Sequence, residues 1–391
     1  MTAARRPRPE DELIRLCVAT ADHRRAHGGR ISALAAQVDW DVLWAALARQ
    51  RLTALVAARL AANGPLPGRF EAAAGAVLAA QRSAAAGAEL IGGRIAGRMN
   101  DGGIRVLPLK GPHLARMAFG DPALRATGDI DLLVDRADLV SAGAVIEGFG
   151  FRLDARTHWD GSLPLLHFRY EHPDGLPPIE LHWRVHWYEE SFATAMLAAA
   201  VTGEDGLLRA TPRDELAALL LMYARDGFTG LRLASDLAAW WDARGPEVRP
   251  GGLESLADRH PALRPALASA AWAAHRRVGL PAARLIGPPR GRRAAVAARI
   301  GDWTLGEPDA QLTANAHLTD VLLSPPRARR SALRRHAIVS PASMRTREDA
   351  LAGVAAPLLR LAATERAARV VRRWAIALWR VRGGREWVAG P

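Results

Sequence analysis

A chain of 391 residues is long enough for two or three domains and a sizeable apolar core. Its apolar runs are far shorter than the roughly 18–20 residues of a membrane-spanning helix, and its first residues lack the apolar segment of a signal peptide. Cys17 is the only cysteine, which excludes a disulfide within the chain and a cysteine metal cluster. We therefore expect a cytoplasmic protein with no membrane span.

The formal net charge of +13 is concentrated near the C-terminus. From Arg327 to Pro391, fifteen arginines stand against four acidic residues, an excess of eleven positive charges. Such a basic segment is typical of a site for an anionic partner, such as RNA, an anionic lipid or an acidic protein. The charge does not select among these partners.

Residues 10 to 100 are predicted to form helices without a catalytic pattern. Asp11 can cap a helix that continues to residue 26, and Asp39 or Asp41 can cap another that continues to residue 60. An alanine-rich helix is expected from Phe70 to Met99. This segment therefore predicts an N-terminal helical region.

A strand, a turn and a short helix are predicted to follow. The run from Ile104 to Leu109 is short and apolar, which is typical of a buried strand. Gly111 ends this run, and Pro112 suits the first position of a helix, where its missing N–H costs nothing. The free N–H groups at the start of that helix can bind an anion such as phosphate.

Lys110 is the only lysine among the 53 Lys and Arg residues. A single lysine beside a predicted phosphate-binding turn indicates a need for a compact ammonium, which a planar guanidinium does not replace. The alternative interpretation is that one lysine survived by chance.

Two aspartates occupy alternate positions of the next predicted strand. Asp129 and Asp131 point to the same face, with Cα atoms roughly 6–7 Å apart. Two such carboxylates repel each other unless a proton or a cation neutralises them, and Mg²⁺ is a hard ion that prefers oxygen ligands. A solvated strand edge is the alternative, but the apolar neighbours Ile130 and Leu132 favour a buried strand.

A third carboxylate lies in a predicted hairpin. After a helix over 136–148 and a strand over 150–154, residues 163–171 and 178–186 form two arms around Pro173 to Gly175. Glu180 has apolar neighbours in the second arm, so it needs a partner, and a position on the adjacent strand would bring it to the two aspartates. Three carboxylates can hold two divalent ions that support phosphoryl or nucleotidyl transfer. Simple alternation along a half-exposed strand is the alternative.

From residue 211 onward the chain is predicted to be helical again. Thr211 caps a helix with Pro212 at its first position, and Arg232 and Asp236 can form an i,i+4 ion pair. We favour this structural role for Arg232 over contact of Arg225 and Arg232 with a nucleotide.

Three kinds of segment are predicted in the last hundred residues. We expect a polar stretch up to Ala316, a partly irregular segment from Pro325 to Arg347, and an amphipathic helix from Glu365 to Arg382. We favour the interpretation that this last helix docks on the rest of the protein and exposes its arginines to solvent. The alternative is that its arginines form a site for an anionic partner.

The chain resembles the uncharacterised nucleotidyltransferase family of the DNA polymerase β-like superfamily in four motifs: LKG at Leu109–Gly111, Arg125, DIDLLV at Asp129–Val134 and IELHW at Ile179–Trp183. The resemblance is close over residues 103–186 and looser in the flanking helices, including LRLASDLAAWW. It implies an α+β fold with a small mixed-sheet nucleotidyltransferase core. Together with the helical patterns, it predicts an N-terminal helical region (1–100), the core (101–190) and a C-terminal helical domain (205–391) with a basic tail (327–391).

The resemblance also implies roles for individual residues. In that superfamily two aspartates and a third acid bind two Mg²⁺ ions, which here would be Asp129, Asp131 and Glu180. The turn before the helix contacts the triphosphate, which here would be Gly111 and its neighbours. Most of the superfamily has Gly-Ser in this turn, whereas this chain lacks that serine. We expect Lys110, with Arg125, to replace the serine as the partner of the phosphates.

These residues predict a Mg²⁺-dependent nucleotidyltransferase. It would move a nucleoside monophosphate from an NTP, with ATP as the expected donor, to a hydroxyl group of a small molecule, a peptide or protein, or an RNA. The alternative is a non-catalytic module on a degenerate core that senses nucleotide or binds RNA or protein. The complete set of three acids argues against degeneration.

Overall fold

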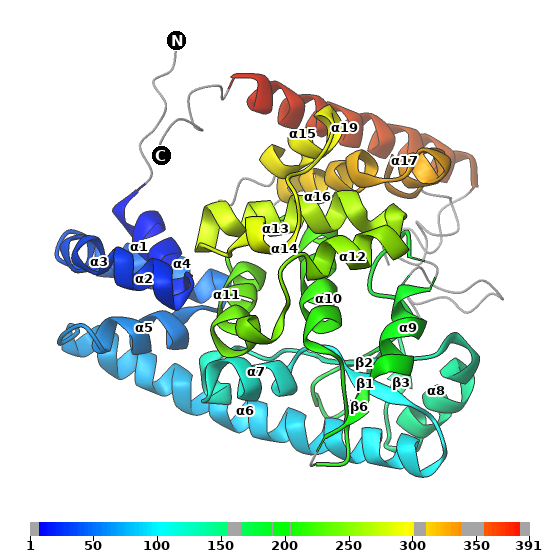
Figure 1. Ribbon diagram of the computed structural model, residues 1–391, viewed down its shortest axis with the longest axis horizontal. Coiled ribbons are helices and arrows are strands. Elements are labelled where there is room, and N and C mark those ends of the chain that lie inside the picture. Colours follow the sequence, from blue (N-terminus) through cyan, green and yellow to red (C-terminus); the bar gives the residue numbers. More distant parts are fainter. Residues whose placement is uncertain are drawn as a thin grey trace.

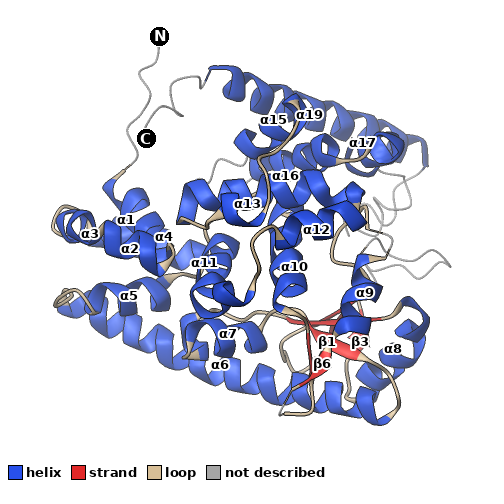
Figure 2. Cartoon of the chain, viewed as in Figure 1, coloured by secondary structure: helices blue, strands red, loops and turns tan. Residues whose placement is uncertain are grey.

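The computed structural model describes residues 8–154, 166–189, 191–203, 205–300, 310–337 and 356–383. Helices dominate the molecule, and a small sheet lies between them (Figures 1 and 2). This arrangement confirms the predicted α+β class with a small mixed sheet and helical flanks.

The helices before and within the sheet region are α1 (Pro9–Val18), α2 (Ala21–Ala26), α3 (Gly28–Ala35), α4 (Trp40–Gln50), α5 (Thr53–Ala61), α6 (Gly68–Asp101), α7 (Pro112–Phe119), α8 (Leu139–Gly148) and α9 (Phe192–Ala199). The later helices are α10 (Pro212–Arg225), α11 (Arg232–Arg244), α12 (Gly252–Arg259), α13 (Arg264–Val278), α14 (Ala282–Leu285), α15 (Arg292–Ile300), α16 (Ala310–Leu323), α17 (Arg329–Ala337) and α19 (Ala356–Gly383).

Five short strands form the sheet in the order β1-β2-β5-β4-β3. The central pair β2–β5 is parallel and the other pairs are antiparallel. The strands are β1 (Val106–Pro108), β2 (Ile130–Val134), β3 (Arg152–Leu153), β4 (His167–Glu171) and β5 (Ile179–His182), and β6 (Val201–Thr202) and β7 (Leu208–Arg209) form a separate ribbon. The hairpin predicted from the glycine and proline signals is thus confirmed as β4–β5.

The two faces of the sheet have different neighbours. On one face Ile130, Leu132 and Val134 pack in an apolar cluster with Ile95 of α6 and Ile146 of α8. Leu133 faces the other way, into the cluster that contains the apolar residues of α10 and α11. Because side chains alternate along a strand, Asp131 shares the face of Leu133. The polar residues of β2 therefore point away from α6, toward α10 and α11.

That second apolar cluster joins helices from distant parts of the sequence. Leu16 of α1 and Leu47 of α4 pack in the same cluster as Leu220 of α10 and Leu267 of α13. In Figure 1, α6 runs along one side of the molecule beneath these helices and the sheet. Helices on both sides of the sheet region in the sequence therefore share one core.

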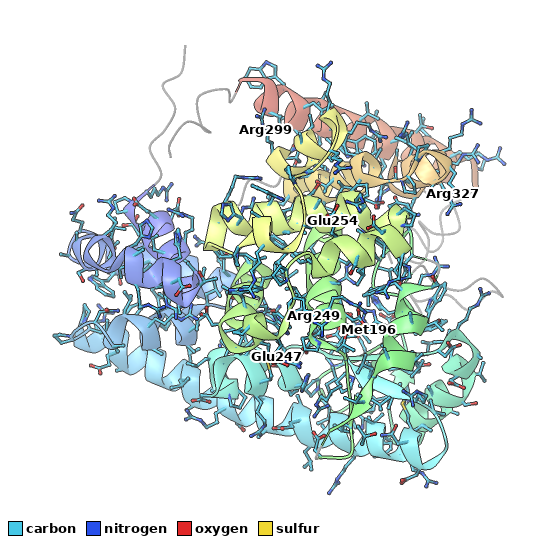
Figure 3. All side chains as sticks on the ribbon, viewed as in Figure 1. Met196, Glu247, Arg249, Glu254, Arg299 and Arg327 are labelled. Carbon is cyan, nitrogen blue, oxygen red and sulfur yellow. The ribbon has the colours of Figure 1, made fainter. Side chains whose placement is uncertain are left out.

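A third apolar cluster attaches the C-terminal helices. Trp374 of α19 is buried, and its indole N–H donates a hydrogen bond to the Ala314 carbonyl of α16, with Nε1 and O 3.0 Å apart. Arg299 of α15 and Arg327, just before α17, lie on this layer (Figure 3). The predicted amphipathic helix is confirmed as part of α19, and its apolar face docks in part, since Val370 and Trp374 are buried whereas Val371 and Trp379 are exposed. Binding of RNA or an acidic protein to the basic segment stays a prediction.

Two helices predicted to be continuous in the N-terminal region are each divided into shorter helices, so these predictions are wrong. The helix expected up to residue 26 ends at Val18, because the Thr20 N–H donates to the Val278 carbonyl at the end of α13. The helix expected up to residue 60 is interrupted at Arg51, which has a left-handed backbone with φ of 56°. This break turns the buried Leu52 inward. Both breaks depend on tertiary contacts that local propensity does not contain.

Two segments of the C-terminal part contain helices that the sequence did not indicate. The stretch expected to be polar up to Ala316 is helical from Ala310 onward, in α16. Within the segment expected to be partly irregular, residues 329–337 form helix α17, and residues 338–347 lie outside the described residues. Packing against α19 stabilises these helices, although their sequences alone are weakly amphipathic.

Within the described chain no single helix is long and apolar enough to cross a membrane. Helices α3 and α4, taken together as a bent pair, reach the required length and apolar composition, and nothing further supports a span there.

Candidate functional site

The three predicted carboxylates meet at the central strand pair. Asp129 immediately precedes β2, Asp131 lies within it, and Glu180 lies on the parallel strand β5 directly opposite Asp131. One oxygen from each carboxylate lies within 4.8 Å of the others. The structure therefore confirms that the hairpin brings Glu180 beside the aspartates.

Lys110 offsets one of the two negative charges of the aspartate pair. Its Nζ atom is 2.7 Å from Asp131 Oδ2 and 3.6 Å from Asp129 Oδ2. Burial alone would raise the pKa of Asp131, but the Lys110 ammonium and His182 hold that pKa well below its usual range. Burial alone would lower the pKa of Lys110, but Asp131 and Asp129 raise it. The structure thus places the lone lysine on the acids, where it stays charged.

Two histidines extend the cluster along the sheet. His182 Nε2 lies 3.0 Å from Asp131 Oδ1 and 3.5 Å from Glu180 Oε2. His167 Nε2 lies 3.8 Å from Glu180 Oε2. Burial lowers the pKa of His167 to about 4, so this imidazole is neutral at pH 7. Burial raises the pKa of Glu180 but His182 and His167 outweigh it and hold the pKa at about 2, so the carboxylate is ionised.

Sequence reasoning missed His167 and gave His182 no role. His182 belongs to the IELHW motif two residues after Glu180, and His167 is its direct partner across the β4–β5 pair. The spacing of the hairpin arms could have indicated this pairing, because His167 and His182 are nearly equidistant from the turn at 173–175. The register itself becomes known only from the structure.

The turn before α7 requires glycine at position 111. Gly111 has φ of 72°, and a Cβ atom there would lie 3.3 Å from the Asp129 carbonyl oxygen. Pro112 begins α7 as predicted. Arg125 donates a hydrogen bond to the Gly111 carbonyl at 3.4 Å and forms a two-pronged ion pair with Asp236 at 2.8 and 2.9 Å. Arg125 therefore holds the turn in place through the Gly111 carbonyl group.

The predicted ion pair between Arg232 and Asp236 is wrong. Asp236 is engaged by Arg125, and Arg232 instead donates a hydrogen bond to the Ala126 carbonyl at 3.0 Å. Both arginines of the alternative hypothesis, Arg225 and Arg232, line the cavity at the site. Tertiary packing overrides the i,i+4 pairing because the buried Arg125 has a greater need for a counter-charge.

Gly111→Ala is expected to destabilise the protein by about 1–3 kcal/mol, because alanine at this backbone geometry is strained. The added methyl group would also push the turn away from Asp129. Denaturant unfolding of the variant and of wild type measures the difference in the free energy of unfolding. Gly97→Ala is the matched control, since Gly97 lies in α6 with open space around it. Equal unfolding free energies for Gly111→Ala and wild type would contradict the prediction.

A cavity of about 770 Å³ opens over the carboxylates. Of the predicted residues, Lys110, Arg125, Asp129 and Glu180 line it, and Asp131 is buried beside them. Arg225 and Arg232, the arginines of the alternative hypothesis, also line it, and the charged residues that the sequence did not indicate are Arg49, Arg51, Asp226, Asp320, Arg335 and Arg366. Cations outnumber acids around the cavity, which suits an anionic ligand such as a triphosphate.

Arg225 of α10 lines the cavity and interacts electrostatically with Asp131 and Glu180. It pairs with Asp226 at 3.1 Å, and its Nη1 atom is buried without a hydrogen-bond partner. Burial alone would lower the pKa of Arg225, but Asp226, Asp131 and Glu180 raise it. A buried donor without a partner beside carboxylates is a feature that an anionic ligand can complete.

The carboxylate cluster also fits a divalent cation. Its ligand atoms are oxygens, which Mg²⁺ prefers, and Asp129 Oδ1 is buried and accepts no hydrogen bond. Such an orphaned oxygen is stabilised by a cation. The oxygens of Asp129, Asp131 and Glu180 are therefore of the kind and spacing that could hold a hard metal ion.

Comparison with known proteins agrees with this chemistry. A family model described as uncharacterised nucleotidyltransferase matches residues 36–278, which is more than half of the chain. No curated protein and no solved structure matches the sequence. The match includes the acids, the turn, Arg125 and Asp236, and it ends before the C-terminal helices that complete the cavity. The chain belongs to the uncharacterised nucleotidyltransferase family, which supports a general role in nucleotidyl transfer.

Proposed function

We propose that this protein transfers a nucleoside monophosphate from an NTP, with ATP as the expected donor, to a hydroxyl-bearing acceptor and releases pyrophosphate. The observation that carries the proposal is the β2–β5 register, which sets Glu180 opposite Asp131 and beside Asp129 in a cation-lined cavity. The acceptor is a small molecule, a peptide or protein, or an RNA.

In this proposal Asp129, Asp131 and Glu180 would hold two Mg²⁺ ions. Divalent ions bound there would neutralise charge on the transferring phosphoryl group and favour ionisation of the acceptor hydroxyl. Glu180 is ionised at neutral pH, because its pKa is about 2, and it borders the cavity. Glu180 could also accept the proton of the acceptor hydroxyl, but only once bound metal ions have lowered the pKa of that hydroxyl, because a carboxylate with so low a pKa is a weak base.

Lys110 and Arg125 have different tasks in the proposal. The Lys110 ammonium supplies compact positive charge for the β- and γ-phosphates in place of the missing serine hydroxyl. Arg125 has its charge balanced by Asp236 and holds the Gly111 carbonyl. It therefore positions the turn, and the free N–H groups at the start of α7 would bind the phosphates.

Thermal stabilisation by each of the four NTPs, with and without Mg²⁺, tests this function. A ligand that binds the folded state at about a hundred times its dissociation constant stabilises it by about 2.7 kcal/mol. We expect a rise in melting temperature that requires both an NTP and Mg²⁺ and that disappears in Asp131→Asn. No rise with any NTP would contradict the proposal. A rise that needs neither metal nor Asp131 would favour a nucleotide-sensing module instead.

A further inference from the structure

We propose a second kind of metal site beside the three carboxylates, formed by His167, Glu180 and His182, that binds a divalent transition-metal ion of the Zn²⁺ class. One ligand atom from each of these three residues lies within 4.8 Å of the others. The inference goes beyond nucleotidyl transfer, because the binding of this ion requires neither a nucleotide nor an acceptor.

Strand pairing places the three ligands on one face of the sheet. Glu180 and His182 are two residues apart on β5, so their side chains point the same way. His167 lies directly opposite His182 on the antiparallel strand β4. Ligands carried by paired strands are held more accurately than ligands on loops. The site therefore needs no rearrangement of the backbone.

The distances between the ligand atoms suit a tetrahedral ion. Glu180 Oε2 lies 3.5 Å from His182 Nε2 and 3.8 Å from His167 Nε2. A tetrahedral Zn²⁺ with ligand bonds of about 2.0–2.1 Å separates its ligand atoms by about 3.3 Å. Side-chain shifts of a few tenths of an ångström would close the difference. Imidazole nitrogens also favour Zn²⁺ and related ions over Mg²⁺, which prefers oxygen.

Neighbouring groups orient two of the ligands. His182 Nδ1 lies 3.4 Å from the Arg184 carbonyl oxygen, so a proton on Nδ1 frees Nε2 for a metal ion, which would take the place of the proton that Nε2 now shares with Asp131 Oδ1 at 3.0 Å. Arg169 Nη1 lies 3.5 Å from Glu180 Oε1, on the other oxygen of the carboxylate. Glu180 Oε2 thus faces the histidines while Oε1 faces the arginine. Metal-binding histidines and carboxylates in proteins are held by outer partners of this kind.

The site is open on its cavity side. His167 and Glu180 both line the large cavity, so an ion held by three protein ligands would keep a position for water or a substrate oxygen. Glu180 also belongs to the group with Asp129 and Asp131. It would therefore connect an all-oxygen position, suited to Mg²⁺, with a nitrogen-rich position suited to Zn²⁺.

Zinc titration of the full-length protein, freed of metal with a chelator, tests the site. We expect wild type to bind one Zn²⁺ tightly and His167→Gln to bind it at least tenfold more weakly. Co²⁺ should give the visible absorption of a four- or five-coordinate ion in wild type and lose it in His167→Gln. His167 is the decisive position because its side chain is 30% exposed, so the variant will fold, whereas His182 is fully buried.

His172→Gln is the matched control. His172 lies just beyond β4, at the start of the hairpin turn, and its Nδ1 accepts a hydrogen bond from the Asp174 N–H at 3.2 Å, away from Glu180. This variant should bind Zn²⁺ as wild type does. Equal affinity of wild type and His167→Gln, or X-ray absorption of the 1:1 zinc protein without imidazole scattering, would overturn the inference. Because no nucleotide is present, these results are independent of the outcome with Mg²⁺ and NTP.

Discussion

Asp129→Asn and Asp131→Asn are each expected to lower nucleotidyl transfer by about a thousandfold. A metal ion stabilises the transition state by several kcal/mol, and each 1.4 kcal/mol corresponds to a factor of ten. Asparagine keeps the shape of aspartate but removes the negative charge that holds the ion. The measurement is Mg²⁺-dependent release of pyrophosphate from the NTP that stabilises the protein, with candidate acceptors present.

The two variants differ in their expected effect on stability. Asp131 is fully buried between Lys110 and His182, so its loss leaves buried positive charge without a partner. The Asp129 side chain is 24% exposed, so Asp129→Asn should change stability less. If Asp131→Asn has a lowered melting temperature, Asp129→Asn still measures the catalytic effect separately from stability. Circular dichroism verifies the fold of each variant.

Asp135→Asn is the control for both activity variants. Asp135 follows the same strand and accepts a hydrogen bond from the Ala137 N–H at 3.0 Å, a capping role that asparagine fills equally well. It lies outside the cavity lining, and its variant should retain full activity. Activity of Asp129→Asn or Asp131→Asn within a few-fold of wild type would refute the proposed role of the acids.

Asp236→Ala is expected to destabilise the protein by about 3–5 kcal/mol, because it leaves the buried Arg125 guanidinium without a counter-charge. The side chains of Arg125 and Asp236 are 3% and 1% exposed. For a protein of this size the change corresponds to a fall in melting temperature on the order of 10 °C. The double variant Arg125→Met/Asp236→Leu should recover much of this stability, because apolar residues of similar volume can replace a buried ion pair.

A surface ion pair provides the comparison for this prediction. Arg30 and Glu12 have the same kind of pairing, with Nη2 and Oε2 2.7 Å apart, but the Arg30 side chain is 49% exposed. Glu12→Ala should therefore cost less than about 1 kcal/mol. If Asp236→Ala and Glu12→Ala cost the same, burial does not determine the strength of the Arg125–Asp236 pair. Thermal or denaturant unfolding of the four proteins decides the question.

The local sequence determined the elements that carry the chemistry. Alternation identified the strand with Asp129 and Asp131, and glycine and proline marked the turn at Gly111 and the hairpin that carries Glu180. These signals are local, because side-chain periodicity and the backbone preferences of glycine and proline act over a few residues. The family resemblance named the same residues, and the match over residues 36–278 confirmed the family.

Only the tertiary structure decided how these elements meet. His182 contacts Asp131 across 51 residues of sequence, and Arg125 contacts Asp236 across 111. The opposite wall of the cavity comes from α16, α17 and α19, beyond the family match. Such contacts depend on strand register and helix packing, which integrate weak preferences over the whole chain. For this reason the sequence predicted the acids, the turn and Arg125, but not the histidines, the partner of Asp236 or most of the other arginines that surround the cavity.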